Sequence, residues 1–172
     1  VDGAFRLVDR RFLNHTEFGY DRFWDALVAE GVGRIADAEA DFRAAAEPTR
    51  QAHAGSYPVY HQMPYELTPA EMAQFAEALR PFARFRLGGL LLQAGRPAEA
   101  LAVLQPDDGP YTGLTEAMRT APNRAAGCQA ATNWATANPQ FLASLNVGVG
   151  HSHWTPELLC GYMPLEERRL DP

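Results

Sequence analysis

The segment HSHWTPELLC, residues 151–160, gathers residue types that bind metal ions. His151 and His153 are two positions apart, so on an extended backbone both imidazoles point to the same side. Cys160 follows a short stretch later and supplies a third side chain. Imidazole nitrogen and thiolate sulfur together favour Zn²⁺ or copper. One interpretation of the segment is therefore a metal site formed by His151, His153 and Cys160.

The same segment also has the pattern of a helix start. Thr155 precedes Pro156, and a hydroxyl residue followed by proline is typical of helix N-termini. In that arrangement Trp154 packs against Leu159 as a hydrophobic staple. No Cys-x-x-Cys or His-Glu-x-x-His motif accompanies the histidines. The capped helix start is therefore the first interpretation, and the metal site is the second.

A second unusual segment, residues 51–67, contains three tyrosines, two prolines and two histidines. Tyrosine offers a large flat contact surface at low entropic cost, and long irregular connections in small domains are often functional. We expect this segment to bind a protein partner. The residues expected to make the contacts are Tyr57, Tyr60, His61 and Tyr65. The alternatives are a loop packed over the helices, or a ligand or metal site that adds His53 and Met63.

The C-terminal residues PLEERRLDP are charged and polar. Such an end is often frayed. The alternative is an arm that docks on a partner, with Arg168 and Arg169 pairing to carboxylates.

Several catalytic classes are excluded or poorly supported by the residue types. The chain has no lysine, which excludes a Schiff-base lysine and a Walker-type phosphate loop. No serine lies in a Gly-x-Ser-x-Gly elbow. Cys128 lies in an alanine-rich helical stretch, where a buried structural cysteine is the commoner case. The sequence predicts no catalytic residue, so we favour a protein without activity of its own, although an enzyme stays open.

Composition limits the partners and the compartment. The net charge is −6 and there is no block of basic residues, so we expect no nucleic-acid binding. No apolar run approaches the roughly 20 residues of a membrane span. The N-terminus lacks the apolar core of a secretory signal, which favours the cytoplasm, with the periplasm and secretion as alternatives. The two cysteines are free thiols in a cytosol or a single bridge outside it. The lysine-free, alanine-rich composition fits a GC-rich bacterial genome.

Helix signals recur along the chain. A cap residue followed by proline occurs at Thr68-Pro69 and Asn138-Pro139 as well as before Pro156. Strand alternation is scarce, so we predict an all-α fold of antiparallel helical hairpins with long loops. Apolar stripes, each expected to form a helix, run over residues 23–28, 35–45, 72–79, 87–94, 98–104 and 123–137. The stripe over 98–104 includes Leu101, and the last one places Ala126, Ala130, Trp134 and Ala137 on one face. We expect one domain over residues 1–172, with an arm at 1–20, hairpins over 21–105, and helices and a tail over 106–172.

Two stretches resemble tetratricopeptide units. Residues 87–104, LGGLLLQAGRPAEALAVL, place small residues at Gly88, Gly95 and Ala100, and put Leu104 at that family's aromatic position. Residues 33–45 resemble the second half of a unit. The two turn glycines are 62 positions apart, which is no multiple of the roughly 34-residue period, and the resemblance covers about a third of the chain. It implies an interaction scaffold without catalytic residues. An irregular helical bundle is the alternative.

These observations favour a non-catalytic interaction protein or accessory subunit of a larger enzyme complex, bound to a larger protein or to copies of itself. The first alternative is a metal-binding protein or small metal-dependent enzyme. A second alternative is a helical carrier whose apolar cavity is lined by Phe75, Phe82, Phe85 and Trp134.

Overall fold

The computed structural model describes residues 20–46, 69–105, 109–146 and 154–161. All regular structure in these ranges is helical, which confirms the all-α prediction. No helix in these ranges is long and apolar enough to cross a membrane. The α-helices are α2 (Tyr20–Gly31), α3 (Ile35–Ala46), α4 (Pro69–Gln93), α5 (Pro97–Leu104), α6 (Thr112–Arg119), α7 (Arg124–Ala137) and α8 (Pro139–Asn146), and the 3-10 helices are η2 (Gly109–Tyr111) and η3 (Pro156–Leu159).

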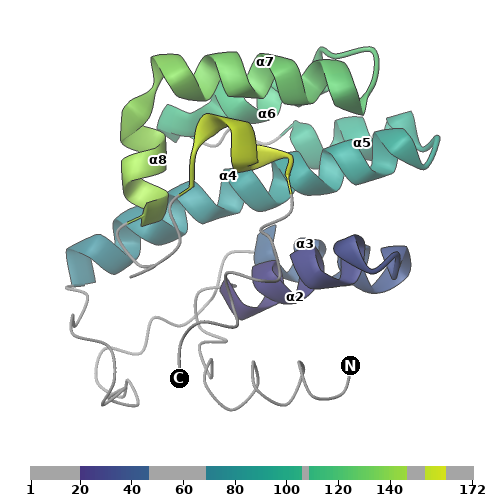
Figure 1. The fold of residues 1–172 in the computed structure, drawn as a ribbon, viewed down its shortest axis with the longest axis horizontal. Helices are drawn as coiled ribbons and strands as arrows, with labels where there is room; N and C mark the ends of the chain where they lie inside the picture. The colour runs from purple at the N-terminus through teal and green to yellow at the C-terminus, as the bar shows by residue number, and fades with distance from the viewer. Residues whose placement is uncertain (1–19, 47–68, 106–108, 147–153, 162–172) are drawn as a thin grey trace.

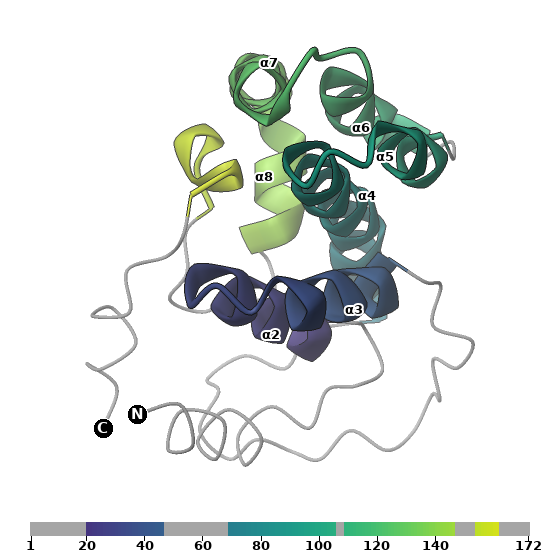
Figure 2. The same ribbon diagram turned by 90° about the vertical axis from the view of Figure 1, so that its right-hand side faces the viewer.

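Six of the helices form three hairpins that lie one above another (Figure 1). The α2–α3 hairpin lies at one end, the α4–α5 hairpin in the middle and the α6–α7 hairpin at the other end, an order that Figure 2 also shows. The stack is held by packing of α3 on α4 and of α4 on α6, while α8 packs on α4 and η3 on α7. Residues that are far apart in the chain are therefore brought together across the hairpin boundaries.

The first two hairpins turn in the same way. Gly33 and Gly95 have φ angles of +79° and +72°, a left-handed conformation that glycine adopts without a Cβ penalty. The amide after each glycine donates back to the helix, with Arg34 N 2.8 Å from Ala29 O and Arg96 N 2.9 Å from Leu91 O. This is the Schellman pattern, which satisfies carbonyls at the end of a helix. The sequence Gly-Arg thus closes α2 and α4 alike.

Gly88 allows the close approach of α4 and α5. A Cβ atom built at Gly88 would lie 2.6 Å from Leu104 Cδ1 and 2.7 Å from its Cγ. Any larger residue at this position would collide with a side chain that is itself only 3% exposed. The small residue is therefore required by packing between the two helices.

The core is rich in aromatic side chains. The ring centroids of Phe23 and Phe82 are 4.8 Å apart, and those of Phe82 and Trp154 are 5.0 Å apart in an edge-on arrangement. Phe75 and Phe85 are also buried in this core, and Trp134 packs on Phe141. The aromatic residues considered as a cavity lining are thus packed core residues.

One prediction of two separate helices is wrong. The stripes over 72–79 and 87–94 belong to a single helix, α4, which continues through Pro81. Proline removes one helical hydrogen bond and crowds the preceding turn. Phe82 and Phe85 just after it are fully buried, and their packing outweighs that local cost.

Two predicted faces are shifted. On α7 the expected core face comprises Ala126, Ala130, Trp134 and Ala137. Trp134 does pack against the core, but Ala130 and Ala137 are exposed, and the fully buried residues are Gly127, Ala131 and Ala135. Because alanines occur on every side of this helix, periodicity could not choose between neighbouring faces. On α5 the expected core residue Leu101 is 43% exposed. Helix α6 lies outside the predicted stripes, whereas the helix start expected at Asn138-Pro139 is confirmed by α8.

Candidate functional site

The most deeply buried charges lie where the three hairpins meet. Arg86 of α4 and Glu30 of α2 form an ion pair, with Arg86 Nη2 2.7 Å from Glu30 Oε2 and both side chains 1% exposed. The second carboxylate oxygen of Glu30 accepts a hydrogen bond from Arg124 Nη2 of α7. Arg124 also donates to Gln93 Oε1 over 2.6 Å. One carboxylate therefore connects α2, α4 and α7.

Arg86 also holds the C-terminal segment. Its Nη1 donates to the backbone carbonyls of Leu159 and Gly161, at 3.2 and 3.1 Å. Its guanidinium carbon lies 5.9 Å from the ring centroid of Phe42, within cation–π range. A buried charge is tolerated where it is paired and hydrogen-bonded, and both terminal nitrogens of Arg86 meet this condition with groups of the protein itself.

The protonation chemistry of this centre suits a structural role. Burial raises the pKa of Glu30, but the attraction of Arg86 and Arg124 and their hydrogen bonds outweigh it, so the pKa lies below the ordinary value. Glu30 thus stays ionised near neutral pH, and arginine does not give up its proton in that range. Neither group is poised to transfer a proton at neutral pH. The centre holds the hairpins together.

Four further contacts anchor residues 154–161. The side-chain amide of Asn146 pairs with the backbone of Trp154, accepting from its N at 2.7 Å and donating to its O at 3.1 Å. Thr132 Oγ1 donates to Pro156 O over 3.2 Å. A disulfide joins Cys128 of α7 to Cys160. The Trp154 ring, 3% exposed, packs between Phe23 and Phe82.

The structure answers part of the question raised by HSHWTPELLC. A helix does begin at Pro156, as the first interpretation predicts, although it is the 3-10 helix η3 and the Thr155 side chain makes no capping bond. Trp154 packs into the aromatic core. A disulfide sulfur is not a thiolate, so Cys160 can bind a metal ion only when its bond to Cys128 is reduced, and the site of His151, His153 and Cys160 stays a prediction. His151 and His153 lie outside the described residues.

No group of three or more histidine, cysteine or acidic side chains in the described ranges is arranged to hold a metal ion. The residues expected to bind a partner also lie outside those ranges, so their role stays a prediction. They are Tyr57, Tyr60, His61, Tyr65, Arg168 and Arg169.

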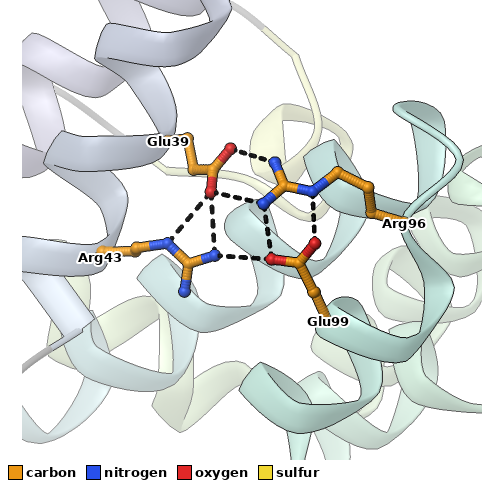
Figure 3. A network of polar contacts seen from close by, with 4 residues as sticks. All are labelled: Glu39, Arg43, Arg96 and Glu99. Carbon is orange, nitrogen blue, oxygen red and sulfur yellow. Dashed lines mark hydrogen bonds and ion pairs between the residues drawn. The ribbon is translucent and has the colours of Figure 1, made fainter.

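A second charge cluster lies on the surface between the first two hairpins (Figure 3). Glu39 of α3 contacts Arg96, which precedes α5, with Glu39 Oε2 2.5 Å from Arg96 Nη1. Arg43 Nη2 is 2.9 Å from Glu39 Oε1 and 3.6 Å from Glu99 Oε2. Arg96 closes the ring by binding Glu99. Hydrogen bonds from Arg96 are the main cause that lowers the pKa of the Glu39 and Glu99 carboxyls below the ordinary value.

Sequence reasoning missed the buried centre. Arg86 stands between two apolar residues, but so does Arg84 in the same stretch, and Arg84 is only half-buried, so the sequence pattern does not single out Arg86. Glu30 and Arg124 carry no signal of burial either, since Glu30 lies next to the last residue of α2 and Arg124 is the first residue of α7, and charged side chains at helix ends are usually exposed.

Comparison with protein families, curated proteins and solved structures finds no match for this chain.

Proposed function

We propose that the protein is a non-catalytic interaction module, acting as an accessory subunit of a larger complex. The observation that carries this proposal is the way its buried charges are used. The buried charges join the three hairpins and the C-terminal segment through Arg86, Glu30 and Arg124. Stacked hairpins present extended surfaces for partners, which is how helical repeat proteins work.

The finer description as a tetratricopeptide-like stack belongs to the same proposal. Two features support it: the repeated Gly-Arg turn at Gly33 and Gly95, and the approach of α4 and α5 at Gly88. Both features fall in the two stretches whose sequences resemble that family.

We further propose an oxidising compartment, the periplasm or the exterior, in place of the cytoplasm expected from the sequence. The Cys128–Cys160 disulfide supports this choice, since structural disulfides persist in oxidising surroundings and are rare in the cytosol.

The test is affinity purification of the tagged full chain from its own cells. The wild-type chain is expected to bring down one protein in stoichiometric amount, and Tyr57→Ala combined with Tyr60→Ala is expected to weaken its recovery at least tenfold. Glu77→Ala is the matched control, because Glu77 is an exposed residue of α4. Absence of any stoichiometric partner would contradict the proposal, and undiminished recovery by the tyrosine variant would contradict the assigned contact residues.

A further inference from the structure

The contact between α3 and the second hairpin shows what kind of helix fits a Gly-Arg turn. Helix α3 presents a glutamate and, four residues later, an arginine, Glu39 and Arg43. Glu39 binds the turn arginine, Arg96, and Arg43 approaches the acidic residue three positions further on, Glu99 (Figure 3). The turn therefore binds helix α3 through two ion pairs. In one the arginine belongs to the turn, and in the other it belongs to the helix.

The first hairpin has the same turn. Gly33-Arg34-x-x-Asp37 matches Gly95-Arg96-x-x-Glu99 in sequence and in its backbone hydrogen bonds. Its arginine and acid also pair, with Arg34 Nη1 3.3 Å from Asp37 Oδ2, as Arg96 and Glu99 do. The local chemistry that receives α3 is thus present a second time in the chain.

Among the described residues, the two turns differ in the ion pairs of their arginines. Arg96 binds a carboxylate from another hairpin, whereas in the described ranges Arg34 forms an ion pair only with Asp37. The Nε of Arg34 is buried without a hydrogen-bond partner there. Val32 and Ile35, on either side of Gly33-Arg34, are 47% and 43% exposed, and they are two of the three large apolar residues exposed in the described ranges. A charged pair flanked by exposed apolar side chains is suited to contact with a helix.

We propose that Val32, Arg34, Ile35 and Asp37, here named the Gly33 turn surface, dock an amphipathic helix of a protein partner that carries Glu and, four residues later, Arg. Its glutamate binds Arg34, its arginine faces Asp37, and its apolar residues cover Val32 and Ile35. The inference rests on the proposed interaction function and specifies the partner's chemistry. Because exposed ion pairs are individually weak, the charges mainly select the orientation and register of the helix.

The direct test uses a helix-stapled peptide with the sequence of α3, IADAEADFRAAA, titrated into the isotope-labelled full chain and followed by amide chemical shifts. The expected result is shifts at residues 32–37, with the apparent Kd raised at least tenfold by Arg34→Glu. A peptide with Glu39→Arg and Arg43→Glu is expected to regain binding to the chain with both Arg34→Glu and Asp37→Arg. Shifts at residues 95–99 would instead report displacement of α3 from its own site and would count against the proposal.

Arg119→Glu is the matched control, because Arg119 pairs with an acid three residues away, Glu116, on the distant helix α6. Should Arg34→Glu unfold, Val32→Ser combined with Ile35→Ser tests the same surface. Peptide binding that is insensitive to these changes would overturn the proposal. Self-association of the chain that Arg34→Glu abolishes would also overturn it, by assigning the surface to a second copy. A co-purified partner fully retained by Arg34→Glu would overturn this surface but leave the proposed function standing.

Discussion

Arg86 Nη2 lies 2.7 Å from Glu30 Oε2 in an ion pair whose two side chains are 1% exposed. Since Glu30 also binds Arg124, a single carboxylate is shared by the three hairpins. Arg86 extends the connection to the carbonyls on either side of Cys160. The arrangement of the hairpins and the position of the C-terminal segment are therefore coupled through one buried group.

The first prediction concerns removal of that charge. Glu30→Gln removes the carboxylate charge that pairs with the buried Arg86, and removing one partner of a buried ion pair costs about 3–5 kcal/mol. We expect a loss of that size in the free energy of unfolding, measured by urea denaturation. Glu77→Gln, at an exposed position of the same residue type, is expected to change it by less than about 0.5 kcal/mol. An equal loss in the free energy of unfolding for the two variants would contradict a stabilising role of the buried Glu30 ion pair.

The second prediction concerns pH. The pKa of Glu30 lies below its ordinary value of 4.5, so below pH 4.5 the unfolded chain binds more protons than the folded chain. The stability that Glu30 contributes is complete above about pH 4.5 and is lost as pH falls through the lower, folded pKa. The difference in unfolding free energy between the wild-type chain and Glu30→Gln should therefore shrink on acidification. A difference that stays constant from pH 7 to pH 3 would contradict the assignment.

The third prediction concerns the close approach of α4 and α5. Gly88→Ala places a Cβ 2.6 Å from Leu104 Cδ1, and overpacking of this kind costs about 1–3 kcal/mol. In a chain that already carries Leu104→Ala, the collision is gone and the alanine should be neutral or stabilising by up to about 1 kcal/mol, because alanine favours helix over glycine. Thermal or urea unfolding of the four chains in this cycle measures the change of sign. Additive effects would show that the two residues are not in close contact.

The fourth prediction concerns the disulfide. Cys128 and Cys160 close a loop with a sequence separation of 32, for which chain-entropy arguments give about 3–4 kcal/mol of stabilisation. Dithiothreitol should lower the unfolding midpoint of the wild-type chain and leave that of Cys128→Ser combined with Cys160→Ser unchanged. Thiol titration of protein isolated from its own cells under alkylating conditions should find no free thiol. Two free thiols in such a sample would contradict the oxidising compartment.

The sequence predicts the helical class because capping residues and apolar periodicity are local signals. Asn138-Pro139, for example, marks the start of α8 correctly. It misplaces the buried face of α7, since alanines surround that helix and the choice between Gly127 and Ala126 depends on what packs there. It also splits α4 at Pro81, because the tertiary packing of Phe82 that carries the helix through proline is not visible locally.

The candidate site was harder to predict from the sequence than the fold. The pairing of Cys128 with Cys160 and the meeting of Glu30 with Arg124 join positions 32 and 94 residues apart, and no spacing rule fixes such contacts. Arg86 has apolar neighbours on both sides, but so does Arg84, so the local sequence does not tell which arginine is buried.

The central claim is that this chain is an accessory subunit without a resident metal. The most direct test is native mass spectrometry of the untagged protein from its own cells, with elemental analysis of the same sample. The account predicts a complex of this chain with one larger protein in fixed stoichiometry and no stoichiometric zinc or copper. A lone chain carrying one zinc or copper ion, lost when His151 and His153 are both replaced by alanine, would contradict it and establish the metal-binding alternative.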